Sequence, residues 1–378
     1  MFRLSHYIQQ LITPTEITHF RKASAPVVIW NLTRRCNLTC QHCYSTSANR
    51  FFPNELTIEQ IFTVMTDLKV FKVPVLILSG GEPLLHPNIF EISRQAKAMG
   101  FYVALSTNGS LITQDNIDII KMINYDYIGI SLDGLAKTHD QFRRQQGAFD
   151  LAWQGIELCL EQQIKVGVRY TLTQTNYADF YDLVALINQR GISKFYLSHL
   201  NYGGRGFVNR KTDALFSQTR EIMHWLFNTA YQRQAQGLAC EWVTGNNDAD
   251  AVYFLHWVKQ YHPQFWNVID KQLQQWGGNA SGIQVANIDP LGEVHADTFW
   301  WHYSLGNVKN RSFSEIWQDV SNSLMAGLKQ RPRQLKGRCG QCAYLSICNG
   351  NSRVRAHQAF NDFWAEDPGC YLSENEIS

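Results

Sequence analysis

Three cysteines within eight residues are the first feature of this sequence that could carry out chemistry. Cys36, Cys40 and Cys43 are separated by three and two residues, a spacing that chance alone rarely produces. Three thiolates can bind three irons of a [4Fe–4S] cube, and such cubes normally have four protein ligands. A structural zinc site would need a fourth protein ligand, which the neighbouring His42 could supply. The pattern favours an iron–sulfur cluster with one open iron, and zinc is the alternative.

An open iron suits S-adenosylmethionine, because its amino and carboxylate groups can chelate the metal. One electron from the cluster then breaks a carbon–sulfur bond and releases a 5′-deoxyadenosyl radical, which removes hydrogen from unactivated carbon. Such radical chemistry belongs to the cofactor, while the protein positions and shields it. We therefore expect a [4Fe–4S] cluster and S-adenosylmethionine at this loop.

Later motifs offer further groups for the same cofactor. Gly80 and Gly81 allow a close backbone approach, and the Glu82 carboxylate, with peptide carbonyls, could hold an ammonium group. Two later motifs, STNG and SLDG, carry groups suited to ribose: Ser106, Thr107, Asn108, Ser131 and Asp133. Each motif alone is also an ordinary turn, so the three-cysteine loop is what favours cofactor binding.

Four more cysteines gather late in the chain, namely Cys339, Cys342, Cys348 and Cys370. Four thiolates can bind zinc or an iron–sulfur cluster, and beside the first loop we expect a second, auxiliary [4Fe–4S] cluster. Four cysteine ligands leave no open iron, which suits electron transfer. The nearby basic residues either offset cluster charge or form a solvated face: Lys336, Arg338, Arg353 and Arg355. Cys159 and Cys240 stand alone and are expected to be structural.

Alternating strands and helices must position these groups. Strands are expected at residues 27–33, 74–80, 102–108, 127–133, 165–172 and 194–200. Helices are expected at 57–68, where Thr57 and Gln60 form a capping-box pattern, and at 88–99, 113–124, 148–163, 177–190 and, in a longer stretch, 214–276. This order predicts a parallel sheet covered by helices, with the ligand face at the carboxyl ends of the strands. The pattern alone does not choose between an open doubly wound sheet and an incomplete barrel.

The motifs CNLTCQHC, GGEP, STNG and SLDG, in this order, resemble those of the radical SAM superfamily. The resemblance implies an α/β fold, a partial (β/α)6 TIM-like barrel with a loop-rich C-terminal iron–sulfur domain. It also implies that Cys36, Cys40 and Cys43 ligate the cluster, that His42 packs near adenine, that Gly80, Gly81 and Glu82 bind the methionyl amino group, and that Ser131 lies near the ribose. The late cysteines resemble a SPASM or twitch-type auxiliary-cluster domain. We therefore divide the chain into an N-terminal extension (1–26), the barrel (27–210), a helical bridging segment (211–280) and the auxiliary-cluster domain (281–378).

Other segments resemble the NirJ-type radical SAM proteins of heme d1 biosynthesis. They are SHLNYGGRG at 198–206, VTGNNDADAVYFLHW at 243–257, GGNASG at 277–282 and DTFWWHYSLGNV at 297–308. The resemblance implies a tetrapyrrole substrate derived from siroheme by decarboxylation, with two ring propionates removed or converted. The auxiliary cluster would accept an electron from the product radical, and a low-potential flavodoxin or ferredoxin would supply the first one.

Carboxylates of such a substrate call for guanidinium partners, which bind them bidentately. Six arginines lie near predicted strand ends: Arg34, Arg35, Arg143, Arg144, Arg169 and Arg205. Four histidines could also bond a ligand: His199, His256, His295 and His302. The 11 tryptophans could line an apolar pocket or simply form an aromatic core.

Composition and the remaining patterns limit the other classes of function. Lys and Arg number 34 against 32 Asp and Glu among 378 residues, a balance that argues against a nucleic-acid binder. No apolar run reaches the roughly 20 residues needed to span a membrane, and the first 25 residues lack the apolar core of a signal peptide. We expect a cytoplasmic protein whose cysteines are thiols.

Three alternatives stay open. A decarboxylase of another iron-tetrapyrrole, in the siroheme-derived heme route, would share these motifs. A peptide-modifying radical enzyme is disfavoured, because only about 26 residues precede the first strand, too few for a peptide-recognition domain. A zinc-stabilised interaction protein without a reaction is the third.

Overall fold

The computed structural model describes residues 1–14, 24–238 and 240–378. Within these residues ten strands form one sheet, in the order β10-β9-β8-β1-β2-β3-β4-β5-β6-β7. The strands are β1 (Val27–Asn31), β2 (Val75–Ser79), β3 (Tyr102–Thr107), β4 (Tyr127–Ser131), β5 (Val166–Leu172), β6 (Lys194–His199), β7 (Glu241–Gly245), β8 (Val285–Ile288), β9 (Glu293–His295) and β10 (Gly306–Asn307). Neighbours from β8 to β7 are parallel, whereas β9 and β10 are antiparallel additions at one edge.

Helices alternate with the strands and continue after them. In the first half they are α1 (Leu4–Ile12), α2 (Ile58–Val70), α3 (Ile89–Ala98), α4 (Ile117–Ile123), α5 (Ala136–Arg143), α6 (Ala148–Glu161), α7 (Phe180–Gln189), α8 (Arg205–Val208) and α9 (Phe216–Ala235). In the second half they are α10 (Ala249–Tyr261), α11 (Trp266–Trp276), α12 (Phe313–Gln318), α13 (Ser323–Leu328), α14 (Gly337–Gln341), α15 (Leu345–Cys348), α16 (Arg353–Phe360) and α17 (Glu374–Ile377). None of the helices in the described part of the chain combines the length and apolar character that a membrane crossing requires.

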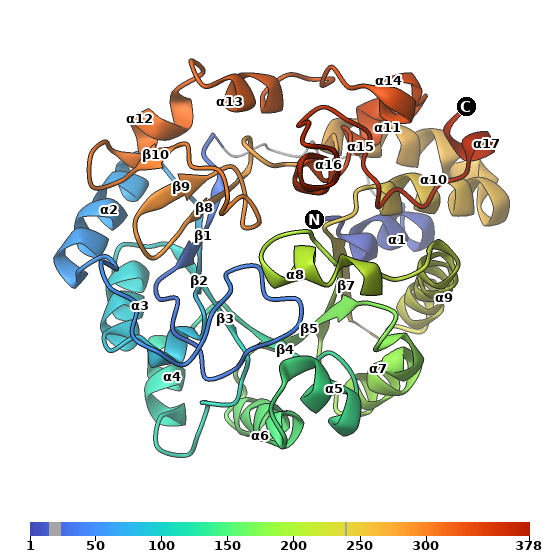
Figure 1. Cartoon of the computed structure of the whole chain (residues 1–378). Coiled ribbons are helices and arrows are strands. Elements are labelled where there is room, and N and C mark those ends of the chain that lie inside the picture. The colour runs from blue at the N-terminus through green and yellow to red at the C-terminus, as the bar shows by residue number, and fades with distance from the viewer. Residues whose placement is uncertain (15–23, 239) are drawn as a thin grey trace.

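The six predicted strands are all present, and their ends differ from the prediction by at most two residues. The capping box of α2 is also formed, since the Thr57 side chain accepts from the Gln60 N–H and the Gln60 side chain accepts from the Thr57 N–H. Figure 1 shows the strands curving around a centre, with α2, α3, α4, α6, α7 and α9 outside them. The expected partial (β/α)6 TIM-like barrel is confirmed.

Two further strands extend the barrel where none was expected. The prediction of continuous helix over 214–276 was wrong at Glu241–Gly245, which forms β7 and pairs with β6. Residues Val285–Ile288 form β8, which pairs with β1 on the opposite side. The polar Asn287 interrupts the apolar pattern, so the sequence did not predict this strand. The Asn287 side-chain amide donates to Ile29 O (2.7 Å) and Asn31 Oδ1 (2.6 Å). The domain boundaries drawn from the sequence stay a prediction.

Alternation along the strands separates the core from a central cavity. Val28 and Trp30 of β1 are fully buried in the hydrophobic core, whereas Val27 and Ile29 of the same strand line the cavity. Cys159 and Cys240 lie in the core, as expected for isolated structural cysteines. The tryptophans serve packing, because Trp30, Trp242 and Trp300 are buried and none lines the central cavity among the described residues.

Candidate active site

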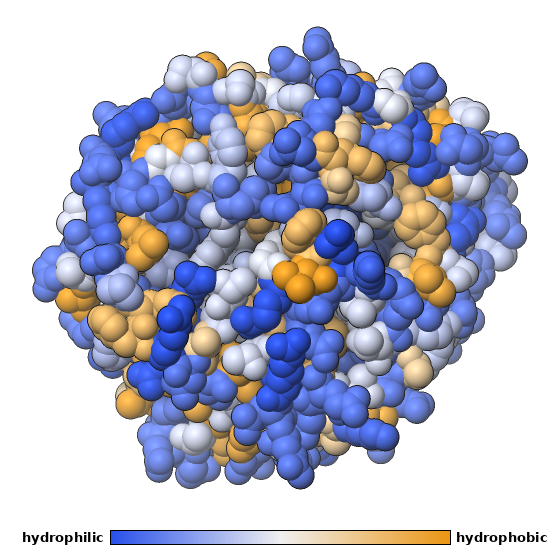
Figure 2. Space-filling view, in the orientation of Figure 1, coloured by the Kyte–Doolittle hydropathy of each residue, from blue (hydrophilic) through white to orange (hydrophobic). Residues whose placement is uncertain are grey.

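A cavity of about 300 Å³ lies inside the curved sheet, between its strands and the loops that follow them. Figure 2 shows this face of the molecule hollowed near its centre, with hydrophilic side chains along much of the rim. Its walls come from inward-facing residues of the strands, including Ser79, Ser106, Ser131, Thr171 and Ser198. Segments far apart in the sequence therefore meet around one space.

The loop with the first three cysteines forms one wall of this cavity, and Cys36, Cys40 and Cys43 all line it. The loop is held from both sides through its backbone. On one side the Gln41 N–H donates to Phe142 O, at the end of α5 (3.0 Å). On the other side Arg205 of α8 donates from Nε to Cys40 O (2.7 Å) and from its backbone N–H to Cys43 O (2.9 Å). The three thiols are thus positioned by contacts that do not use the sulfur atoms.

Several donors nevertheless point at the sulfur atoms. Arg143 Nη1 lies 3.4 Å from Cys40 Sγ, and the Leu38 N–H lies 3.4 Å from Cys36 Sγ. Burial raises the pKa of the Cys36 thiol, and the nearby Glu82 carboxylate raises it further. For Cys40 burial raises the pKa, while the charge of Arg143 opposes this. An iron ligand must be a thiolate, and these donors favour that form.

The donor set fits a cube better than it fits a zinc ion. In the part of the chain that the structure describes, no three His, Cys, Asp or Glu side chains converge on a point where one metal ion could bind. Zinc ligands must converge in this way, whereas the cysteines of a cube each bind a different iron. His42 faces Phe142 instead, with ring centroids 4.7 Å apart. The residues therefore fit three-cysteine ligation of a [4Fe–4S] cluster.

Asp133 acts on this wall through Arg143. It does not line the cavity; its carboxylate forms a buried ion pair with Arg143 Nη2 and accepts from the Thr171 N–H (2.7 Å). Arg143 was expected to be available to a substrate carboxylate, but Asp133 and Cys40 both engage it. Arg143 therefore belongs to the support of the thiol loop.

The Gly80–Gly81–Glu82 segment packs directly on the same loop. A side chain at Gly81 would place its Cβ 2.3 Å from Arg35 O. Glycine is therefore needed here because the backbone of the Arg35 segment packs directly against it. Glu82 is fully buried and accepts from Thr107 Oγ1 (2.7 Å) and from the Asn108 N–H (2.8 Å). Burial raises the pKa of Glu82 to about 7, although these hydrogen bonds oppose the shift. Gly80 and Gly81 line the cavity, and Glu82 lies behind its wall.

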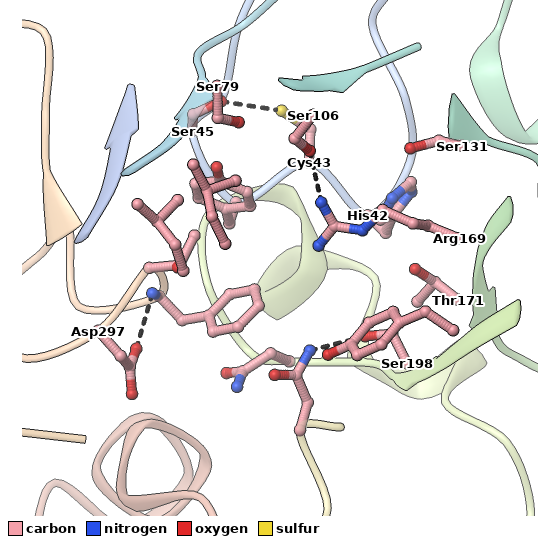
Figure 3. Close-up of a pocket in the computed structure, with 18 of the residues that line it drawn as sticks. His42, Cys43, Ser45, Ser79, Ser106, Ser131, Arg169, Thr171, Ser198 and Asp297 are labelled. Carbon is pink, nitrogen blue, oxygen red and sulfur yellow. Dashed lines mark hydrogen bonds between the residues drawn. The ribbon is translucent and has the colours of Figure 1, made fainter. Parts of the chain in front are cut away.

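The remaining expected cofactor residues line the cavity on the side of the thiol loop. They are His42, Ser106, Asn108 and Ser131. Arg169 of β5 points at this group in Figure 3, and its Nη1 donates to Ser106 Oγ. Its guanidinium also lies over the Tyr196 ring, 5.3 Å from the centroid.

The opposite wall comes from three segments beyond the six predicted strands. Asp248, Asn279 and Asp297 line it, and Asn279 Nδ2 donates to Asp248 Oδ2 (3.2 Å). Burial raises the pKa of Asp248 and of Asp297. The sequence pattern marks these segments but not their carboxylates, because an isolated Asp in a loop carries no periodic signal.

The predicted ligand-binding arginines and histidines are mostly used elsewhere. Arg34 donates to Ser45 O (3.0 Å) and Arg205 to the thiol loop, while Arg35 and Arg144 are exposed. Of the four histidines only His199 lines the cavity in the described structure.

The four late cysteines share a second, smaller cavity of about 20 Å³, lined by Cys339, Cys342, Cys348 and Cys370. The basic residues around it are not a solvated face. Arg353 and Arg355 are buried; Arg355 pairs with Asp367 (2.8 Å), whereas Arg353 donates only to backbone carbonyls among the described groups. Lys336 alone is exposed, and it pairs with Asp362 (2.6 Å).

Comparison with known proteins decides the family. Residues 30–187 match the model of the radical SAM superfamily. Over 378 residues the chain is 49% identical to a pre-heme d1 synthase of Dinoroseobacter shibae, covering 100% of this chain and 93% of that protein. The chain belongs to the radical SAM superfamily.

Further similar proteins also cover most of the chain. An Fe-coproporphyrin III synthase of Methanosarcina barkeri is 39% identical over 367 residues, covering 96% of this chain and 92% of that protein. The structure of Streptococcus suis SuiB bound to S-adenosylmethionine superposes with a TM-score of 0.68 at 19% identity, covering 92% of this chain and 78% of that one. Native anSMEcpe with bound AdoMet and a peptide gives a TM-score of 0.68 at 16% identity, with 93% and 95% covered. These two structures share the fold.

Membership in the radical SAM superfamily makes the protein an S-adenosylmethionine-dependent enzyme and implies a [4Fe–4S] cluster. Three thiols and a set of polar groups that could hold both line the same wall of the cavity.

Proposed function

We propose that this radical SAM enzyme acts in heme d1 biosynthesis, where it removes or converts propionate side chains of a decarboxylated siroheme-type tetrapyrrole. The observation that carries the proposal is the 49% sequence identity, over 100% of this chain, with a protein named pre-heme d1 synthase. When bound, the cluster and S-adenosylmethionine supply the 5′-deoxyadenosyl radical, which removes a hydrogen atom from carbon.

The chain's own residues would divide this work between the two walls of the cavity. Cys36, Cys40 and Cys43 would hold the cluster, and Asp133 would hold Arg143 against Cys40. The proposed S-adenosylmethionine set on the cavity wall is His42, Gly80, Gly81, Ser106, Asn108 and Ser131, with Glu82 behind the two glycines. The opposite wall, with Asp248, Asn279 and Asp297, is left for the tetrapyrrole.

We also propose that the four late cysteines hold a second [4Fe–4S] cluster in a SPASM- or twitch-like domain. Their shared cavity supports this, and so does Arg353, a buried cation without a carboxylate partner among the described residues. A buried charge needs compensation, which a cluster with four thiolates would provide. This cluster would take the electron that leaves the product radical, and a flavodoxin or ferredoxin would reduce the first cluster.

The test is anaerobic incubation of the reconstituted enzyme with reductant, S-adenosylmethionine and candidate tetrapyrroles. We expect 5′-deoxyadenosine together with a mass loss on decarboxylated siroheme. Formation of 5′-deoxyadenosine without any change in this tetrapyrrole, alongside turnover of another substrate, would refute the proposal.

A second candidate is decarboxylation of another iron-tetrapyrrole, which the similarity to the Fe-coproporphyrin III synthase favours. The same incubation separates the two candidates when decarboxylated siroheme and an iron-coproporphyrin precursor are offered in parallel, because only the true substrate changes mass.

A further inference from the structure

One histidine of the cavity wall, His199, belongs to a buried chain of hydrogen bonds that has no part in the proposed binding of the cluster or S-adenosylmethionine. His199 ends β6 and lines the cavity. Its Nε2 lies 3.0 Å from Asp250 Oδ2, on α10. The Tyr371 hydroxyl donates to Asp250 Oδ1 (2.8 Å), and the His199 and Tyr371 rings are stacked at an interplanar angle of 18°. The imidazole is therefore fixed in both position and orientation.

Asp250 is the buried acidic partner of His199. Asp250 is 0% exposed, and in the described part of the chain its only ion-pair partner is His199. A buried carboxylate without a compensating charge is strongly unfavourable. The Tyr371 hydroxyl is neutral, so the proton at the 3.0 Å contact between His199 Nε2 and Asp250 Oδ2 is what compensates the buried Asp250.

One ring nitrogen of His199 is left for a ligand. Nε2 is bound to Asp250, and no hydrogen bond to Nδ1 is found among the described groups. A proton on Nδ1 makes this nitrogen a donor on a residue of the cavity wall, and in the doubly protonated ring the donor is charged. Such a donor favours an anionic oxygen.

The two arginines that line the cavity in the described structure are already engaged. Arg143 pairs with Asp133 and contacts Cys40, and Arg169 donates to Ser106 on the wall that carries the thiols. His199 ends β6, which pairs with β7, and Asn246, just after β7, lines the cavity and donates to Ser198 Oγ (2.6 Å). His199 is thus placed to meet a ligand that lies beyond the thiol wall.

We propose that His199, held by Asp250 and Tyr371, binds a side-chain carboxylate of the tetrapyrrole through Nδ1–H. The inference rests on the proposed function, because it takes a tetrapyrrole carboxylate as the ligand.

Equilibrium binding without turnover tests this. The reconstituted enzyme, kept anaerobic and without reductant, is titrated with decarboxylated siroheme and separately with its methyl ester, and the absorbance change gives Kd. We expect the wild type to prefer the acid over the ester. In H199Q the Kd for the acid should rise roughly ten-fold or more, as for other lost hydrogen bonds to charged groups, and the preference for the acid should disappear. D250N should lose part of the preference, because it removes the carboxylate that fixes the imidazole through Nε2.

His256→Gln is the matched control. His256 also makes one hydrogen bond from Nε2, to Glu376 O (3.0 Å), but it does not line the cavity, so its Kd and its acid preference should match the wild type. Iron content and thermal unfolding show whether each variant is folded. If H199Q is not folded, Y371F takes its place. Y371F should weaken binding of the acid and leave binding of the ester unchanged.

The outcomes separate this inference from the proposed function. If the wild type binds neither decarboxylated siroheme nor its ester, the proposed substrate is wrong and the inference falls with it. If it binds the acid and H199Q keeps the full preference for the acid, only the role of His199 is overturned.

Discussion

The ion pair between Asp133 and Arg143 allows a quantitative prediction about the wall that carries the thiols. The two side chains are 1% and 7% exposed. Burial lowers the pKa of Arg143, but the charges of Asp133 and Cys40 together raise it, and the net shift is upward. Replacing Arg143 with Gln leaves the Asp133 carboxylate buried without its cation. Removal of one partner of a buried pair destabilises a protein by about 3–5 kcal/mol.

Urea unfolding of the cluster-free, reduced protein, followed by tryptophan fluorescence, measures this loss. The control is K97Q, because Lys97 and Asp126 form a more exposed pair (24% and 29%, 2.7 Å) for which we expect about 1 kcal/mol or less. The double variant D133N/R143Q should lose clearly less than the sum of the two single losses, since each single variant strands the other charge.

Two results would refute the reasoning. R143Q could lose no more stability than K97Q, which would mean that the buried carboxylate needs no cation. Alternatively, the losses of D133N and R143Q could simply add, which would mean that the two groups do not depend on each other.

Three further predictions concern other parts of the two cavities. The folded protein keeps Glu82 protonated up to about pH 7, whereas the unfolded chain loses that proton near pH 4.5. The free energy of unfolding should therefore fall by about 3 kcal/mol as the pH rises between these values. In a series of urea unfolding curves at different pH, E82Q should flatten this fall, and an unchanged slope would contradict the prediction. G81A should lower the stability of the same cluster-free protein by about 1–3 kcal/mol, because the new Cβ meets backbone at 2.3 Å, and wild-type stability would show that the two loops are not in contact. In C339A/C348A the iron content of the reconstituted protein should fall by about four iron atoms per chain. 5′-Deoxyadenosine should still form, whereas the tetrapyrrole product should not. A full yield of product would show that the late cysteines are not part of the electron path.

The six strands of the barrel were predictable because each is a short run of apolar residues between helices with a regular apolar stripe. β7 and β8 were not. β7 has five residues within a long helical stretch, and in β8 a buried Asn287 interrupts the apolar run. Asn287 is satisfied by Ile29 and Asn31 on the neighbouring strand, a contact that only the paired strand reveals.

At the site, the spacing of the cysteines identified both thiol groups, and the structure gathers each in a single cavity. The roles of the charged residues were harder to foresee. Arg143 looks like a free guanidinium in sequence, but Asp133, ten residues away, binds it. Asp250 and Tyr371 are 121 residues apart, and no local pattern links them to His199.

The pairing of β8 with β1 has a practical consequence for engineering among relatives. The strand beside the first strand of the barrel is supplied by residues 285–288, well outside the segment at 30–187 that matches the superfamily model. A chimera whose crossover lies before residue 285 would import this strand together with the foreign tail, and Asn287 would have to find Ile29 and Asn31 again. An exchange of C-terminal halves should therefore give a folded chimera only when the crossover falls after β8, so β8 has to be kept with the barrel.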